Sequence, residues 1–434
     1  MIEFGVEYFH KDKKIIWDPL KVINGHIMVV GGSGTGKTYT IRKIIRELIK
    51  TEDEMEFHVI DVHGDIDIGE DVTSTQTFSE TSEVGLQPLE ISEDLEHGGV
   101  RKKVASFINM VNSTNRKLGS NQEISFQYFL YDLYRASGFY QEEPKTWSLK
   151  VDPRKNVKYK KQYPTMNDLK MFVKYKLEQL YLGTNTQAVH RLENLNSIIK
   201  KLETTLRKLS DNKEDNKDKI EAKLQELKDN AKEEYIKYID SIKTGRELEE
   251  ILKYDSKDTI KSIYNRIESL INTGIFKSKA PEFDSKKQVK RYKINSLNQE
   301  EQKMFVTILL EKLFFLSKEK GEQNGVKQLI IIDEAHKFIS NNSEDIINII
   351  MKEARKFGLG LVFGSQSFNH FSEDIISNTS TKIILGIDEM YQEASAKKLN
   401  IEKKLLTYIK PQETALIQIK NKKDNVNFKS CILK

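Results

Sequence analysis

Gly31-Gly-Ser-Gly-Thr-Gly-Lys-Thr38 lies between a short apolar run, residues 26–30, and a segment whose apolar residues recur at helical spacing, residues 39–49. This order of strand, glycine-rich loop and helix predicts a phosphate-binding P-loop. Glycines allow the backbone to curl so that several N–H groups point at phosphate oxygens, and the following helix adds its positive N-terminal end. A merely flexible Gly/Ser turn would not explain why Gly-Lys-Thr lies between an apolar strand and an amphipathic helix.

The chemistry of this loop predicts ATP and Mg²⁺ as its ligands. Lys37 is expected to reach the β and γ phosphates, and the Thr38 hydroxyl is expected to bind Mg²⁺. The residues that we expect to contact the nucleotide are Gly31, Gly32, Ser33, Gly34, Thr35, Gly36, Lys37, Thr38 and Tyr39.

The composition is that of a charge-rich protein without a membrane-spanning or secretory segment. Hydrophobic residues make up 38% of the 434 residues, and charged residues make up 31%. No apolar run approaches the roughly 20 residues that cross a bilayer, and the N-terminus lacks the apolar core of a signal peptide. We therefore expect a cytoplasmic protein with no membrane partner. The single cysteine, Cys431, excludes an internal disulfide and any zinc site built from cysteines.

Strands alternate with helices on both sides of a long insertion, which predicts an α/β fold with a parallel sheet and helices on both faces. The first half of this core is expected in residues 1–92, with a β-hairpin over residues 2–18 and an edge strand over residues 85–91. The second half is expected in residues 288–434. Its predicted elements are the strands 289–294, 328–332, 359–364, 382–387 and 414–420 and the helices 299–316, 343–357 and 389–398.

Residues 93–287 predict a helical insertion. Between about residues 189 and 243, Leu192, Leu195 and the apolar residues after them step by alternating threes and fours, a pattern typical of a coiled coil. A polar stretch, residues 210–216, divides the pattern, so we expect an antiparallel coiled-coil hairpin. Two interpretations stay open: a protruding arm that docks a partner, or one layer of an ordinary helical subdomain.

Two acidic residues, Asp333 and Glu334, follow directly on the apolar strand 328–332. We expect this strand to lie beside the P-loop strand, so that Asp333 holds Mg²⁺ together with Thr38 and water. Glu334 can then act as the general base that polarises the attacking water. The acidic segment 61–65 follows another apolar strand, and it forms either part of the magnesium water shell or simply a polar turn.

Two further residues are candidates for catalysis. Gln366 follows the apolar strand 359–364, where its amide can donate to the γ phosphate and orient the water. Arg355 lies near the end of the preceding helix. It can either reach a neighbouring subunit's γ phosphate or complement the dipole of its own helix.

Together these motifs resemble those of the HerA/FtsK group of P-loop ATPases, and most closely its HerA-like branch. The segments that carry the resemblance are 26–38, 59–66, 118–122, 164–169, 274–276, 331–336 and 354–366. The resemblance implies a RecA-like core, ATP hydrolysis at the subunit interfaces of a hexameric ring, translocation of duplex DNA, and a role in trans for Arg355. The small net charge of +5 does not conflict with a DNA partner, because a ring concentrates its basic residues in the pore.

The sequence also departs from the group's pattern. HerA-like proteins usually carry a small β-barrel before the ATPase core, and the residues before the P-loop have room only for a hairpin. Residues 409–414 lack the glycine often found in this turn, and Ser367 follows Gln366 where arginine is frequent. We expect a nuclease or other effector as partner, in DNA processing or antiviral defence, with the insertion as its docking surface. The alternatives are a nucleotide-gated scaffold that moves no DNA, and a conjugation- or secretion-type ATPase.

Overall fold

The computed structural model describes residues 1–96, 98–114, 117–154, 160–182, 186–211, 217–241, 253–340, 345–422 and 427–434. In this part of the chain, one sheet of eleven strands has the order β2-β1-β11-β10-β9-β3-β8-β7-β4-β6-β5. The strands are β1 (Ile2–Glu7), β2 (Lys14–Trp17), β3 (Ile27–Val30), β4 (Glu56–Asp61), β5 (Thr73–Thr77), β6 (Val289–Lys293), β7 (Gln328–Ile332), β8 (Leu359–Ser365), β9 (Thr381–Ile384), β10 (Thr414–Ile419) and β11 (Lys429–Leu433).

The central part of the sheet, from β9 to β5, is parallel and contains the P-loop strand β3. Beyond β9, the strands β10, β11, β1 and β2 extend the sheet with antiparallel pairs. The prediction of an α/β fold with a largely parallel sheet is confirmed. The predicted N-terminal hairpin exists as β1 and β2, and it joins the same sheet because β1 pairs with β11 near the other end of the chain.

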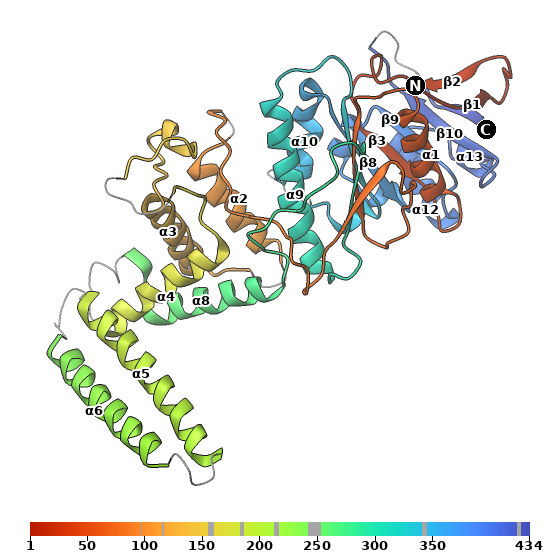
Figure 1. The fold of residues 1–434 in the computed structure, drawn as a ribbon. Coiled ribbons are helices and arrows are strands. Elements are labelled where there is room, and N and C mark those ends of the chain that lie inside the picture. Colours follow the sequence, from red (N-terminus) through yellow and green to blue (C-terminus); the bar gives the residue numbers. More distant parts are fainter. Residues whose placement is uncertain are drawn as a thin grey trace.

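Helices cover both faces of the sheet. Alternate residues of β3 point into two cores, because successive side chains of a strand face opposite sides. Ile27 and Val29 pack in the core that contains α1, whereas Met28 and Val30 belong to the core that contains α9 and α10 (Figure 1). The helices are α1 (Lys37–Ile49), α2 (Val100–Asn112), α3 (Ser120–Ala136), α4 (Met166–Leu182), α5 (Thr186–Asp211), α6 (Lys217–Ser241), α8 (Lys257–Asn272), α9 (Gln299–Glu319), α10 (Ile346–Glu353), α11 (Glu373–Asn378), α12 (Glu389–Leu399) and α13 (Lys403–Thr407).

The helices α2 to α8 lie beside the sheet on the side that α9 covers (Figure 1). Buried side chains of α2, α3 and α8 continue the core that α9 forms against the sheet. A buried ion pair also joins Lys103 of α2 to Glu311 of α9, with 2.9 Å between Nζ and Oε2. The insertion is therefore anchored to the sheet through α9, the helix that leads into β7.

Helices α5 and α6 form an antiparallel pair that projects away from the rest of the molecule (Figure 1). Leu195, Leu224 and Leu227 are buried along this pair, while Ile199 and Leu206 are 40% and 47% exposed. The helical hairpin that the sequence predicts is present. Its apolar stripe, however, is wider than one partner helix can cover. The turn at residues 212–216 lies outside the described residues.

Some predicted elements are wrong in detail. Residues 85–91 make only an isolated bridge from Leu86 to Phe276, and β5 forms the sheet edge instead. The helix predicted over residues 343–357 starts at Ile346 as α10 and ends as the 3₁₀ turn η3 (Ala354–Phe357). Strand β7 does not lie beside β3, because the fully buried strand β8 pairs with both of them.

A buried lysine in the sheet predicts how stability depends on pH. Lys382 of β9 is 2% exposed, and within the described ranges its Nζ donates to the Thr379 carbonyl and the Gln418 side chain. Burial, and then the charge of Lys420, lowers the pKa of Lys382 from 10.5 to about 7. The unfolded chain therefore binds more protons than the folded chain between these two values, so the free energy of unfolding should rise as pH rises from 7 toward 10.

We expect Lys382→Met to raise the melting temperature at pH 6–7, because methionine carries no charge that must be buried. The advantage should shrink as pH approaches 10, where the lysine is neutral in both states. Thermal unfolding from pH 6 to 10 measures this, with Lys404→Met on the exposed side of α13 as the control. The prediction would be contradicted if the melting temperatures of Lys382→Met and the native protein differed by the same amount at every pH.

Candidate active site

The P-loop connects β3 to α1 with the backbone curl that the sequence predicts. Gly34 and Gly36 have positive φ angles of 74° and 97°, a region that glycine adopts without a steric penalty. The Thr35 hydroxyl donates to the Gly32 carbonyl at 2.9 Å and closes the curl. Lys37 Nζ donates to the carbonyls of Gly31 and Gly32, at 2.7 Å and 2.9 Å. The ammonium group is thus held at the loop, where a phosphate chain would be bound.

The ends of two neighbouring strands hold the start of the loop. The Gly31 N–H donates to the Ser365 carbonyl at the end of β8, at 3.1 Å. The Gly32 N–H donates to the Gly386 carbonyl just after β9, at 2.8 Å. Gln366, the residue after Ser365, is exposed at this edge of the sheet. The structure therefore places Gln366 directly after a residue that contacts the P-loop.

Asp333 follows β7, with β8 between it and the P-loop strand. Its carboxylate still lies next to α1, because Gly364 of β8 has no side chain. A Cβ at Gly364 would be 2.4 Å from Asp333 Oδ1 and 3.3 Å from Ile41 Cδ1. Ile41 is one helical turn beyond Lys37, so the carboxylate and the second turn of α1 both approach this glycine. Asp333 is close to the P-loop although the two strands are not neighbours.

Glu334 has an unusual backbone conformation. Its φ angle is +50°, in the left-handed region that a glutamate rarely adopts. Its side chain is 12% exposed, and Oε2 lies 3.2 Å from His336 Nδ1. The His336 ring stacks on the His370 ring, with 4.8 Å between their centroids. Such strain persists only where the surrounding structure imposes it, and here it occurs at a residue that the sequence marks as a candidate base.

The charge environment of Asp333 fits a divalent cation. Burial raises the pKa of the Asp333 carboxyl, and the charges of Glu334 and Asp65 raise it further. Oδ1 accepts the Glu334 N–H at 2.9 Å, and no lysine or arginine forms an ion pair with Asp333 among the described residues. A buried carboxylate without a cationic partner is costly, and a bound dication would remove that cost. Thr38 and Asp333 offer the hard oxygen ligands that Mg²⁺ prefers.

Of the acidic segment 61–65, Asp61 is a structural residue. It is fully buried, its Oδ1 accepts the Gly64 N–H at 2.7 Å, and its Oδ2 accepts Arg291 Nε at 2.8 Å. The strand that carries it, β4, lies three places from β3 in the sheet. The polar-turn interpretation therefore holds for Asp61, whereas Asp65 lies near enough to Asp333 to influence its pKa.

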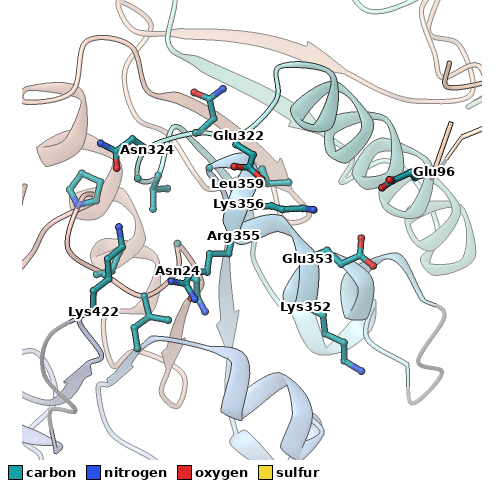
Figure 2. A pocket seen from close by; sticks show the side chains of 18 residues that line it. Asn24, Glu96, Glu322, Asn324, Lys352, Glu353, Arg355, Lys356, Leu359 and Lys422 are labelled. Carbon is teal, nitrogen blue, oxygen red and sulfur yellow. The ribbon is translucent and has the colours of Figure 1, made fainter. Parts of the chain in front are cut away.

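Arg355 lies at the opposite end of the sheet from the P-loop. It belongs to η3, just before β8, whereas the P-loop follows the C-terminal end of β3, the parallel neighbour of β8. The seven residues of β8 span about 23 Å, so Arg355 does not reach the P-loop of its own chain. The exposed guanidinium lines a hollow of about 840 Å³ that Asn24, Lys352 and Lys422 also line (Figure 2).

Comparisons with known proteins agree with this geometry. No family model matches the chain. A probable helicase of Methanocaldococcus jannaschii is 33% identical over 193 residues, which cover 39% of this chain and 36% of the helicase. The DNA double-strand break repair helicase HerA of Saccharolobus solfataricus is 34% identical over 115 residues, which cover 24% of this chain and 23% of HerA. The chain thus spans about a third or less of the length of these curated relatives.

Two solved structures match nearly the whole chain. VirB4 of Thermoanaerobacter pseudethanolicus superposes with a TM-score of 0.64 at 13% identity, covering 100% of this chain and 96% of VirB4. The bacterial conjugative coupling protein TrwB superposes with a TM-score of 0.51 at 11% identity, covering 96% of this chain and 88% of TrwB. This chain has the fold of a HerA/FtsK-type P-loop ATPase.

Two positions next to these residues escape the sequence patterns. Gly364 gives the Asp333 carboxylate its place, and its only sequence signal is a glycine inside a buried strand. Gln412 contacts the P-loop from a distant turn, and its only signal is the missing glycine in residues 409–414. None of the helices in the described part of the chain has both the length and the apolar character that a bilayer span requires.

Proposed function

We propose that the protein hydrolyses ATP at interfaces between identical subunits and uses this energy to move duplex DNA. The observation that carries the proposal is the separation of Arg355 from the P-loop by the length of β8. Arg355 exposes its guanidinium at one end of the strands, and the phosphate site lies at the other end. The two form one site only when two copies of the chain meet head to tail. Heterologous contacts of this kind form a ring when the rotation between neighbouring copies closes.

Each residue of the site has a distinct role in this proposal. The P-loop N–H groups and Lys37 bind the β and γ phosphates, and Thr38 and Asp333 hold Mg²⁺, which neutralises phosphate charge. Glu334 accepts the proton of the attacking water, while the Gln366 amide donates to the γ phosphate. Arg355 of the neighbouring copy stabilises the charge that develops in the transition state. Two chains are needed to complete one active site.

The proposal also covers how many copies of the chain assemble and which partners they bind. The HerA helicases among the relatives support duplex DNA as the substrate, and the motif resemblance supports a ring of six. The projecting α5–α6 hairpin, with its partly uncovered apolar stripe, supports an effector such as a nuclease as partner. We propose that the protein and this effector act together in DNA processing or antiviral defence.

A second candidate function is favoured by the structural matches. VirB4 and TrwB superpose on nearly the whole chain, which supports a conjugation- or secretion-type ATPase. Such an enzyme would act with membrane-bound partners rather than with a nuclease. Copurification of the protein with membrane components would favour this candidate over the first.

The test measures ATP hydrolysis with and without linear duplex DNA, together with the mass of the assembly. We expect DNA to stimulate hydrolysis several-fold in a complex of six chains, and Lys37→Ala to abolish hydrolysis in both conditions. Hydrolysis that duplex DNA leaves unchanged would contradict the motor and favour a nucleotide-gated scaffold. The absence of hydrolysis under every condition would contradict the ATPase itself.

A further inference from the structure

The turn that precedes β10 carries a strained residue next to the P-loop. Gln412 has a φ angle of +66°, in the left-handed region where a side chain of its kind is disfavoured. The Gln412 Nε2 donates to the Gly34 carbonyl at 3.0 Å, although the two residues are 378 positions apart in the sequence. A strained conformation and a long-range hydrogen bond therefore coincide at one residue.

The turn also approaches a second P-loop glycine, Gly36, and Gly386, whose carbonyl holds the start of the loop. A Cβ at Gly36 would lie 3.8 Å from Gln412 Cγ, and a Cβ at Gly386 would lie 3.7 Å from Pro411 Cγ. A Cβ at Gly34, by contrast, would meet nothing within 4 Å. The tip of the P-loop is thus open around Gly34 and supported by Gln412.

The turn itself is held firmly by the sheet. The Thr414 N–H donates to the Lys410 carbonyl at 2.9 Å, and the Lys410 N–H donates to the Thr414 hydroxyl at 2.8 Å. The Leu433 N–H donates to the Glu413 carbonyl at 2.9 Å, which ties the turn to β11. The position of Gln412 is therefore set by β10 and β11, and the hydrogen bond restrains the P-loop rather than the turn.

The direction of this restraint matters for phosphate binding. In a trans peptide the C=O and the following N–H point in opposite directions. Fixing the Gly34 carbonyl toward Gln412 therefore makes the Thr35 N–H point the opposite way, within the same peptide plane. Because glycine φ and ψ angles are permissive, the Gly34–Thr35 peptide would otherwise rotate freely.

We propose that Gln412 is a positioning residue that holds the Gly34–Thr35 peptide in the orientation needed to bind nucleotide phosphates. This inference rests on the proposed binding of ATP at the P-loop. The restraint comes from the side chain of a turn that lies 378 positions from Gly34 in the sequence. It also makes the C-terminal strands β10 and β11 part of the nucleotide site.

The test compares the binding of fluorescent Mg-ADP, and the KM and kcat for ATP, between the native protein and two variants. Gln412→Gly removes the amide and also the φ strain, so it should weaken ADP binding and raise KM about threefold to tenfold, with kcat largely unchanged and the melting temperature equal or higher. Gln412→Glu keeps the size of the side chain but cannot donate, and it adds a negative charge near the phosphates. It should weaken binding further than the glycine variant does.

The matched control is Asn400→Gly. Asn400 also has a positive φ angle, 53°, at the end of α12, so this change relieves similar strain away from the P-loop. It should leave ADP binding unchanged. Native-like binding by both Gln412 variants would overturn the inference, and so would an equal loss of binding in Asn400→Gly. Failure of the native protein to bind ADP would instead overturn the proposed function.

Discussion

Glu334→Gln is expected to lower the rate of ATP hydrolysis by about 100-fold or more while nucleotide binding is retained, because a general base contributes roughly 10² to 10⁴ to a rate. Glutamine has nearly the same shape as glutamate, and it cannot accept the proton of the attacking water. The side chain is 12% exposed, and its Oε2 lies 3.2 Å from His336 Nδ1. Phosphate release and the Kd for fluorescent Mg-ADP measure the two effects separately.

The control for this prediction is Glu54→Gln, which removes a carboxylate that is 86% exposed and pairs with Lys327. This variant should hydrolyse ATP at the native rate. Hydrolysis by Glu334→Gln at the native rate would assign the base to another group, and Asp65 is the next acidic side chain near Asp333. A parallel loss of ADP binding would show that Glu334 holds the nucleotide rather than the water.

The parts of the site that local chemistry encodes could be predicted from the sequence. The P-loop needs glycines at defined positions followed by Lys37 and Thr38, and the pair Asp333–Glu334 needs only a buried strand before it. Both features lie within a few consecutive residues. The helical periodicity of α9 and the continuous apolar runs of β7 and β8 were equally local signals, which is why these elements are confirmed.

The order of the strands could not be predicted in the same way. Whether β7 or β8 lies beside β3 depends on pairing between segments more than 300 residues apart, and both strands have the same fully buried apolar character. The strand β5 was missed because Thr-Ser-Thr-Gln-Thr carries no apolar pattern. The residue Gln412 was missed because its left-handed conformation and its bond to Gly34 are tertiary facts.

Arg355→Ala is expected to abolish most ATP hydrolysis, by about 10³-fold, because an arginine supplied in trans contributes at least that much to phosphoryl transfer. The variant should still bind nucleotide, since the length of β8, about 23 Å, separates Arg355 from its own P-loop. The matched control is Lys356→Ala, which removes the neighbouring exposed cation of η3. Lys356→Ala should retain hydrolysis, because its side chain lies over the Phe357 ring instead of being free to reach outward.

Mixing two inactive variants tests the trans arrangement directly. Lys37→Ala lacks a working P-loop but keeps Arg355, and Arg355→Ala has the opposite defect. In a ring with heterologous interfaces and random mixing at equal amounts, about one quarter of the interfaces combine an intact P-loop with an intact arginine. Hydrolysis should therefore reappear in the mixture although each variant alone is inactive. The contrary result is a mixture that stays inactive under conditions where the subunits exchange. It would mean that Arg355 supports its own helix end and that the two ends of the sheet do not form a shared site.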